Sequence, residues 1–241
     1  MAHCVADTIE RGARDPEIMT TAVAILRPSA SVLPGLGPNL ANLLRLRALA
    51  LSTAGRYDEA LIDVEEALRI CLRATIVRRT TAKVAFAAAL SVRAHVLQCL
   101  GREREAVDDA RQALALCRGR LSHAPHRYGP VLLTALDELA RALNKTGEPR
   151  QALPLGEELV HILRRLAPRR PRYDRFLAGA LHQLGVYISD VGDLTDALRA
   201  ANESLQLYLR LDREQPESYA LQVELATHNR DLFLDRLKRQ G

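Results

Sequence analysis

Apolar residues in this chain recur with the spacing of one helix face, and short polar turns interrupt the pattern at regular intervals. Ahead of Gly55, Leu40, Leu44, Ala48 and Leu51 lie three or four residues apart. That spacing is typical of an amphipathic helix. The same spacing follows the turn, in Ala60, Leu61, Val64, Ala67, Leu68 and Cys71. The pattern therefore predicts two helices joined at Gly55.

The turn itself occurs four times. Its copies are Gly55-Arg-Tyr-Asp-Glu-Ala60, Gly101-Arg-Glu-Arg-Glu-Ala106, Gly147-Glu-Pro-Arg-Gln-Ala152 and Gly192-Asp-Leu-Thr-Asp-Ala197, whose glycines are 46, 46 and 45 residues apart. We expect each glycine to end a helix, because glycine takes the left-handed conformation without steric cost. The alanine that follows lets the next helix approach closely. A fixed period of this length predicts stacked helix pairs.

The pattern resembles the tetratricopeptide repeat. The copy that fits best has Leu181, Leu184, Gly185, Ile188, Gly192 and Ala197 at the family's characteristic positions. The long period resembles the kinesin-light-chain type of repeat. The resemblance implies an all-α, right-handed superhelical solenoid of stacked antiparallel helix pairs, which works by binding other proteins.

The period predicts how the chain is divided. We expect a degenerate half-repeat and linker over residues 1–37, four repeats over 38–79, 80–127, 128–171 and 172–215, and a capping helix over 216–241. Asp15-Pro16-Glu17 predicts the start of the N-terminal helix, which we expect to end near Arg27, before a linker over 29–38. The C-terminal helix would cover the last apolar face with Leu225, Leu232, Phe233 and Leu237.

Two arginines depart from the family pattern. Arg47 and Arg93 stand where the family prefers an apolar residue. Two placements are open: the side chains bend toward solvent, or they pair with carboxylates of the second helix, such as Asp63 and Asp109.

Composition narrows the class of protein. Aromatic residues make up 4% of the 241 residues and tryptophan is absent, so stacking platforms for single-stranded nucleic acid are hard to build. No signal peptide or apolar membrane span is visible, and the four cysteines form no close pair. These features predict a cytoplasmic protein without membrane attachment, whose cysteines stay reduced.

Candidate chemistry is sparse. No phosphate-binding loop, nucleophile motif or paired CxxC occurs. Cys117, His123 and His126 resemble zinc ligands, but a fourth ligand and a known spacing are missing. We therefore predict a protein without enzymatic activity, metal or cofactor.

The most distinctive charge feature is an arginine cluster near the third inter-repeat loop. It comprises Arg164, Arg165, Arg169, Arg170, Arg172 and Arg175. The helix dipole favours one or two cations at a helix C-terminus, by about 0.3–1 kcal/mol each, but not six. Two interpretations are open: the cluster binds an acidic protein or polyanion, or it reflects an arginine-rich composition, since only three of the 34 basic residues are lysines.

The inner face of the repeats is the second candidate surface. Relatives of this kind often clamp peptides with asparagines on their first helices, but the equivalent residues here are Leu46, Val92, Glu138 and Gln183. Only the last helix keeps an asparagine, Asn229. An aliphatic groove around Leu46 and Val92 would suit an amphipathic helix; the alternative is that these residues pack within the stack.

Three functional hypotheses follow. The first is a scaffold or adaptor for another protein or a peptide segment, with an acidic partner favoured by the arginine cluster. The second is a regulatory sensor that binds a peptide or small ligand in the concave groove. The third is binding of a polyanion or nucleic acid along the arginine-rich loop edge. The sequence predicts no oligomeric state.

Overall fold

The computed structural model describes residues 16–32, 36–75, 79–216 and 218–239, and these residues form an all-α protein. They contain ten α-helices and two short 3₁₀ helices, and no strand occurs among them. The predicted fold class of stacked antiparallel helix pairs is confirmed. The chain divides into two compact units, residues 1–138 and 139–241, and the division falls within helix α7 (Pro125–Lys145).

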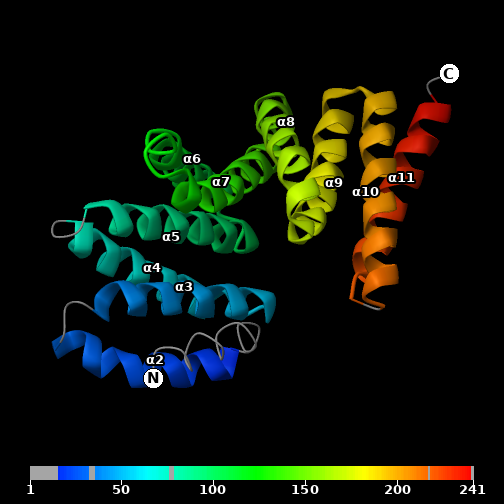
Figure 1. Ribbon diagram of the computed structural model, residues 1–241. Helices are drawn as coiled ribbons and strands as arrows, with labels where there is room; N and C mark the ends of the chain where they lie inside the picture. Colours follow the sequence, from blue (N-terminus) through cyan, green and yellow to red (C-terminus); the bar gives the residue numbers. More distant parts are fainter. Residues whose placement is uncertain (1–15, 33–35, 76–78, 217, 240–241) are drawn as a thin grey trace. The chain divides into compact units, whose positions relative to one another are not determined.

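The first unit contains two complete helix pairs preceded by a single helix (Figure 1). The helices are α2 (Pro16–Val32), α3 (Gly37–Thr53), α4 (Tyr57–Thr75), α5 (Arg79–Cys99) and α6 (Glu103–Arg118), followed by the first part of α7. Helix α3 pairs with α4, and α5 pairs with α6, each across one of the glycine turns.

The second unit begins with the end of α7 and closes with a single helix. Its elements are α8 (Pro149–Leu166), the 3₁₀ helices η2 (Ala167–Arg169) and η3 (Pro171–Tyr173), α9 (Asp174–Val191), α10 (Leu194–Glu214) and α11 (Ala220–Lys238). Helix α9 pairs with α10, and α11 packs against the face that α10 and α9 present.

All four glycine turns have the predicted geometry. The φ angles of Gly55, Gly101, Gly147 and Gly192 are 75°, 72°, 82° and 112°. The backbone N–H of the residue after each glycine donates to a carbonyl five residues earlier, as Arg102 does to Leu97 at 2.8 Å. This arrangement satisfies carbonyls that the end of a helix leaves without partners. The repeated motif therefore fixes how each first helix ends.

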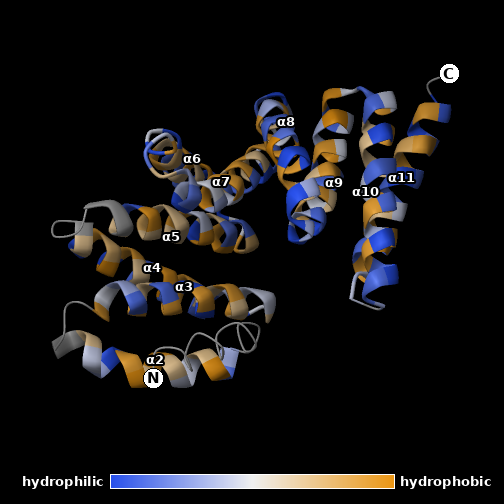
Figure 2. Cartoon of the chain, in the orientation of Figure 1, coloured by the Kyte–Doolittle hydropathy of each residue, from blue (hydrophilic) through white to orange (hydrophobic). Residues whose placement is uncertain are grey.

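Small residues let the two helices of a pair come close. The alanines of the motif, Ala60, Ala106, Ala152 and Ala197, are all 0% exposed. In the last pair, a Cβ at Gly185 would lie 3.2 Å from the carbonyl oxygen of Ala197. Each helix carries both hydrophobic and hydrophilic residues (Figure 2), and the buried residues are mostly apolar. The core is therefore a row of small apolar contacts between adjacent helices and not a single central core.

Helix α2 begins at Pro16 as predicted, but the predicted end near Arg27 is wrong. The helix continues through Pro28 to Val32. Its buried face holds Met19 and Val23, each 1% exposed, and Ala30 packs against the same cluster. The partly buried Ala30 adds to the apolar face of the helix beyond Pro28, and such packing offsets the backbone hydrogen bond that a proline cannot make. Residues 33–35, within the predicted linker, lie outside the described residues.

Two ion pairs show that α2 relates to α4 as α8 relates to α10. Arg27 donates to Glu66 at 2.6 Å, and Arg164 donates to Glu203 at 2.5 Å; both pairs are separated by 39 residues. Glu66 and Glu203 hold equivalent positions, each 11 residues after its turn glycine. Helix α2 therefore packs on α3 and forms ion pairs with α4 and the preceding turn in the manner of a second helix of a repeat. The predicted boundaries of the half-repeat and repeats stay predictions.

Helix α11 packs on the end of the second unit with one of the predicted residues, Phe233, and with Ala226, which was not predicted. Phe233 is 3% exposed and packs on Ala197 and Ala201, and Ala226 is 0% exposed in a cluster with Leu205 and Tyr208. The prediction that Leu225 and Leu232 belong to the buried face is wrong, because they are 49% and 44% exposed. Each directly precedes one of the buried residues in the sequence, and consecutive side chains of a helix point about 100° apart, so both leucines lie beside the buried face.

Candidate partner-binding surfaces

A buried Arg–Asp ion pair is repeated in the first two helix pairs. Arg47 on α3 donates two hydrogen bonds to Asp63 on α4, both 2.5 Å, and Arg93 on α5 donates two of 2.6 Å to Asp109 on α6. The hydrogen bond to Asp63 raises the pKa of Arg47 above its ordinary value, against an opposing effect of burial. Of the two placements open to these arginines, pairing within the helix pair is therefore the correct one.

The third and fourth repeats replace this ion pair with apolar residues. The positions equivalent to Arg93 and Asp109 are Leu139 and Leu155 in the third repeat and Leu184 and Ala200 in the fourth. Leu139 is 5% exposed and Leu184 is 8% exposed. Charged residues therefore hold these positions in the first two helix pairs and apolar residues hold them later in the chain, which is the kind of exchange that buried ion pairs tolerate.

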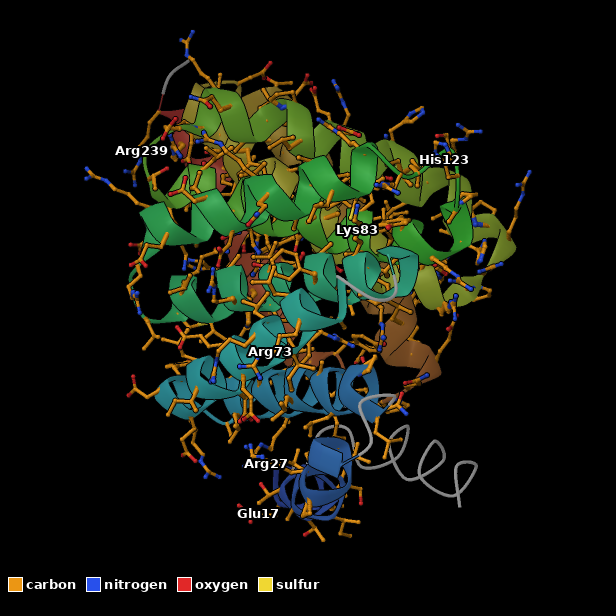
Figure 3. The ribbon with its side chains drawn as sticks, turned by 90° about the vertical axis from the view of Figure 1, so that its left-hand side faces the viewer. Glu17, Arg27, Arg73, Lys83, His123 and Arg239 are labelled. Atoms are coloured by element: carbon orange, nitrogen blue, oxygen red, sulfur yellow. The ribbon has the colours of Figure 1, made fainter. Side chains whose placement is uncertain are left out.

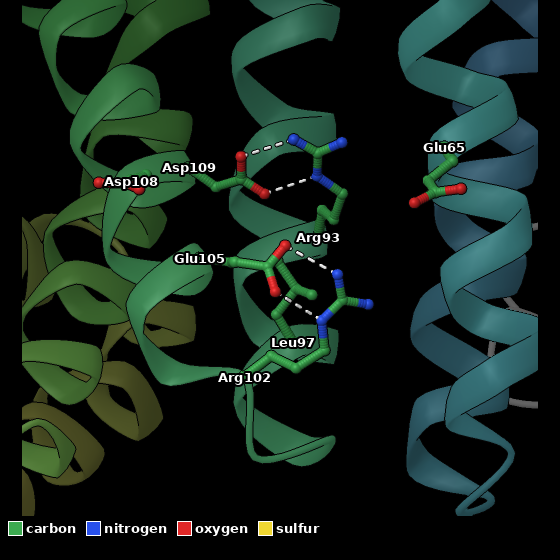
Figure 4. A pocket seen from close by; sticks show the side chains of 7 residues that line it. All are labelled: Glu65, Arg93, Leu97, Arg102, Glu105, Asp108 and Asp109. Carbon is green, nitrogen blue, oxygen red and sulfur yellow. Dashed lines mark hydrogen bonds and ion pairs between the residues drawn. The ribbon is translucent and has the colours of Figure 1, made fainter.

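Beside the second ion pair lies a cavity of about 240 Å³ between α4, α5 and α6 (Figure 4). The residues that line it are Glu65, Arg93, Leu97, Arg102, Glu105, Asp108 and Asp109. Arg102 donates two hydrogen bonds of 2.7 Å to Glu105. Glu65 lies on α4, across the gap from both guanidinium groups (Figure 4). Called the acidic cavity below, this site has four carboxylates and two guanidinium groups.

Charge in the acidic cavity is only partly balanced. The hydrogen bond to Asp109 is the main cause that raises the pKa of Arg93, and the negative charge of Glu65 adds to it. Two carboxylates remain after the bidentate pairs are counted, those of Glu65 and Asp108, and within the described residues neither forms an ion pair. The cavity therefore keeps an excess of negative charge beside the apolar side chain of Leu97.

The arginine cluster lies in the second unit, over the end of α8, the two 3₁₀ helices and the start of α9. All six of its side chains are exposed. Arg164 forms an ion pair with Glu203. Residues 164–175 contain one acidic residue, Asp174, whose carboxylate pairs with Arg210 at 2.7 Å. Among the residues that the structure describes, no carboxylate pairs with the other five arginines.

Two of these arginines stack on aromatic rings. The guanidinium carbon of Arg172 lies 5.2 Å from the ring centre of Tyr173, and that of Arg175 lies 4.6 Å from the ring centre of Phe176. Such stacking leaves the edge of the guanidinium able to donate hydrogen bonds to a carboxylate or phosphate. Phe176 is itself 48% exposed, so the surface combines positive charge with an apolar ring.

The inner-face candidates are mostly embedded in the stack. Val92 is 4% exposed, and Leu46 is half-buried against the core of the first unit. Glu138 is 5% exposed and accepts a hydrogen bond of 2.8 Å from the side chain of Gln98. Gln183 is half-buried. In their present packing these side chains offer little surface for a groove, and their role toward a partner stays a prediction.

The other polar candidates from the sequence, Asn229 and His123, have hydrogen-bond partners within the protein. The side chain of Asn229 lies 3.2 Å from the ring of His182, whose pKa is lowered by burial. No group of metal ligands occurs among the described residues. His123 lies on the surface between α6 and α7 (Figure 3), and Ser122 is its hydrogen-bond partner. None of the described helices is long and apolar enough to span a bilayer.

Comparison with known proteins agrees with this geometry. The family model of the tetratricopeptide repeat matches residues 40–74, 86–125 and 132–170, which contain the first three glycine turns. The chain belongs to the tetratricopeptide-repeat family. The family model does not extend over the fourth turn, although Gly192 and Ala197 have the same geometry as their equivalents.

Solved structures with the same fold include relatives of kinesin light chain. The crystal structure of BtubC (BKLC) from P. vanneervenii has a TM-score of 0.65 at 17% identity, covering 94% of this chain and 89% of that chain. A putative kinesin light chain with nearly identical TPR-like repeats from Podosopora anserina has a TM-score of 0.58 at 22% identity, covering 86% and 94%. A search of curated protein sequences finds no match. At these identities the likeness concerns the fold alone.

Sequence reasoning missed the acidic cavity. Its residues come from α4, α5, α6 and the turn before α6, and only Arg93 among them departs from the family pattern. A comparison between repeats would have found part of it, because Arg56 and Glu59 in the first repeat are equivalent to Arg102 and Glu105 in the second. Glu65 and Asp108 carry no such signal.

Proposed function

We propose that this protein is a non-enzymatic scaffold of the cytoplasm that binds another protein through an acidic segment. Tetratricopeptide repeats support a role in protein interaction in general. The observation that carries the finer proposal is the arginine cluster, in which five exposed guanidinium groups have no carboxylate partner among the described residues.

The chemistry of the cluster favours a carboxylate-bearing partner. Arginine forms two parallel hydrogen bonds with a carboxylate, and pairs of this type are stronger than neutral hydrogen bonds. Like charges gathered on one surface repel one another, so a partner of opposite charge relieves that repulsion and is steered toward the site. The exposed ring of Phe176 adds an apolar contact, which a bare polyanion does not use.

Binding of nucleic acid at the same cluster is the second candidate. Arginine also pairs with phosphates, and the five unpaired guanidinium groups are the observation that favours it. The chain lacks the row of exposed aromatic rings on which single-stranded bases stack. Nuclease treatment should abolish binding of nucleic acid but leave binding of an acidic protein intact. Loss of the Phe176 ring should weaken binding of an acidic protein only.

The proposal is tested by affinity capture from an extract of the source cell. The bait proteins are the unaltered chain, the variant R169E/R170E/R172E, and a control that reverses exposed arginines elsewhere, R104E/R111E/R199E. We expect the unaltered chain and the control to retain the same acidic protein, and the cluster variant to lose it, with nuclease present throughout. Retention of the same proteins by the cluster variant, or capture only when nuclease is omitted, contradicts the proposal.

A further inference from the structure

The thiol of Cys99 differs from those of the other described cysteines because it is exposed. Cys71 and Cys117 are 2% and 0% exposed, and burial raises the pKa of each thiol to about 11. Cys99 is the last residue of α5 and lies at the surface. Among the cysteines that the structure describes, it is therefore the one whose sulfur a compound in solution can reach.

A histidine and a buried carboxylate form a chain of contacts that begins at this thiol. The Sγ atom of Cys99 is 4.0 Å from Nε2 of His95, one turn earlier on α5. The other ring nitrogen of His95, Nδ1, is 3.6 Å from Oε1 of Glu138 on α7. The side chain of His95 is 27% exposed, and that of Glu138 is 7% exposed. All three residues belong to the first compact unit.

Two further side chains contact the ends of this chain of contacts. Gln98 is 5% exposed, and its Nε2 donates to Oε2 of Glu138 at 2.8 Å and to the backbone carbonyl of Glu138 at 3.3 Å. These hydrogen bonds hold the carboxylate in the place where its Oε1 faces His95. At the other end, Oγ of Ser52 on α3 lies 4.0 Å from Sγ of Cys99, and a hydroxyl at this position can donate to the sulfur.

The two nitrogens of the His95 ring suit two different roles. Nε2 accepts the proton of the thiol, and Nδ1–H points its positive end at the carboxylate of Glu138, which stabilises the imidazolium that results. Cys99 lies at the carbonyl end of α5, where the helix dipole favours a cation and disfavours an anion. Ionisation of this thiol therefore depends on His95.

We propose that Cys99 is a site of reversible modification by a low-molecular-weight disulfide, with His95 as the base and Glu138 as a positioning residue. The thiol proton passes to Nε2 of His95, and Sγ attacks one sulfur of the disulfide. A new S–S bond forms as the old one breaks, so that Cys99 is oxidised and the departing sulfur is reduced. The departing thiolate then takes the proton from His95.

Removal of the adduct requires a thiol from solution. Cys71 and Cys117 are buried, so neither can attack the new disulfide while the chain is folded. The site goes beyond the proposed scaffold function and does not depend on it. Cys99 lies in the first compact unit and the arginine cluster lies in the second, so the variant R169E/R170E/R172E should react at the same rate as the unaltered chain.

The test measures how fast the full chain, carrying C4S, forms a mixed disulfide with hydroxyethyl disulfide at neutral pH, by mass spectrometry of the intact protein. We expect one adduct, on Cys99, and a rate about fivefold to tenfold lower in H95Q. The rate of E138Q should lie between those two. The control H161Q, which changes an exposed histidine of α8, should leave the rate unchanged.

The ultraviolet absorbance of a thiolate separates ionisation of the sulfur from access to it. The raised pKa values of Cys71 and Cys117, about 11 each, keep both thiols protonated at neutral pH. Thiolate absorbance that C99S removes therefore belongs to Cys99. We expect H95Q to remove it as well, although the sulfur stays exposed. Absence of this absorbance, an adduct on Cys71 or Cys117 of the folded chain, or an unchanged rate in H95Q overturns the inference.

A synthetic peptide of residues 91–101 gives a comparison that needs no folded variant. The peptide contains His95 and Cys99 but lacks Glu138. We expect its thiol to react with hydroxyethyl disulfide at least about threefold more slowly than Cys99 of the folded chain. An equal or faster rate for the peptide would contradict the role assigned to the buried carboxylate.

Discussion

Arg93 on α5 donates two hydrogen bonds of 2.6 Å to the carboxylate of Asp109 on α6. The two residues are 16 positions apart, with a glycine turn between them. Arg47 and Asp63 form the same pair one repeat earlier, also 16 residues apart. The turn geometry and the ion pair act together, since the turn brings the two helices side by side and the ion pair fixes their register.

Removal of one partner of the first ion pair should destabilise the protein strongly. The side chain of Asp63 is 2% exposed and that of Arg47 is 16% exposed, so the change Asp63→Ala leaves a guanidinium in a poorly hydrated place. We expect a loss of about 3 kcal/mol in the free energy of unfolding, measured by urea titration. Asp109→Ala should cost less, because Arg93 is 31% exposed and nearer to water.

The double change R47L/D63L should recover most of that loss, because the third repeat has leucines, Leu139 and Leu155, at the equivalent positions. A double-mutant cycle with R47L and D63L separates the pairwise energy from the cost of each single change. If the double variant were less stable than both single variants, the apolar residues of the third repeat would not be a structural replacement for the ion pair.

Two glycines of the first unit should differ in their response to alanine. Gly101 has a φ of 72°, which strains any residue with a Cβ, so Gly101→Ala should lose about 1 kcal/mol of stability. Gly129 lies within α7, and a Cβ there would meet nothing within 4 Å. Helix propensity favours alanine at Gly129, but Pro130 follows directly and disfavours helical backbone for a preceding residue with a Cβ, so Gly129→Ala should change stability by less than Gly101→Ala does. Thermal unfolding of both variants measures the difference; a gain at Gly101, or a larger loss at Gly129 than at Gly101, contradicts the assigned geometry.

Burial should protect two cysteines from thiol reagents. It raises the pKa of Cys71 and of Cys117 to about 11 in each case, whereas Cys99 is exposed. In a variant with Cys4→Ser, we expect one thiol to react quickly with Ellman's reagent at neutral to mildly alkaline pH, and two to react only when the protein unfolds. Fast reaction of three thiols in the folded protein would contradict this burial.

The same two thiols make stability depend on pH. Their pKa values are higher in the folded chain than the ordinary value of about 8.5. Above that value the unfolded chain loses protons that the folded chain keeps, so the free energy of unfolding should fall as the pH rises from about 8.5 toward about 11. Replacing both cysteines with alanine should reduce this dependence of the free energy of unfolding on pH. If the dependence were unchanged in the double variant, other groups would be its cause.

Two residues of the last helix should differ greatly in their contribution to stability. Phe233 is 3% exposed, so Phe233→Ala should cost about 3 kcal/mol through lost burial and a cavity against α10. Leu225 is 49% exposed, and Leu225→Ala should cost well under 1 kcal/mol.

Deletion of residues 216–241 should lower the unfolding temperature and promote aggregation, because it uncovers Ala197, Ala201 and Leu205. Unchanged stability and solubility of the deleted form would exclude a capping role for α11.

The repeat pattern predicted the helix pairs because every copy carries the same local signal. The glycine needs a positive φ and the alanine needs to be small, and both requirements are visible in single residues such as Gly101 and Ala106. Pairing of Arg47 with Asp63 was one of two predicted placements, since both residues lie on helices whose register the turn fixes.

The ends and the cavity were harder to predict, for physical reasons. The end of α2 depends on whether Ala30 finds a packing partner, and that partner lies in another helix. In α11, leucines occur on two sides of the helix, so spacing alone does not say which side is buried. The acidic cavity needs Glu65, Arg102 and Asp108 to converge from three segments, which is a property of the packing and not of any one segment.

The most direct test of the proposed scaffold is the dissociation constant of the captured partner for the full chain and for R169E/R170E/R172E, measured by calorimetry at low and at high salt. The account predicts at least a tenfold weaker complex for the variant, and weakening of the unaltered complex as salt screens the charges. A dissociation constant that is the same for both proteins, and that salt does not change, would contradict the claim that the arginine cluster holds an acidic partner.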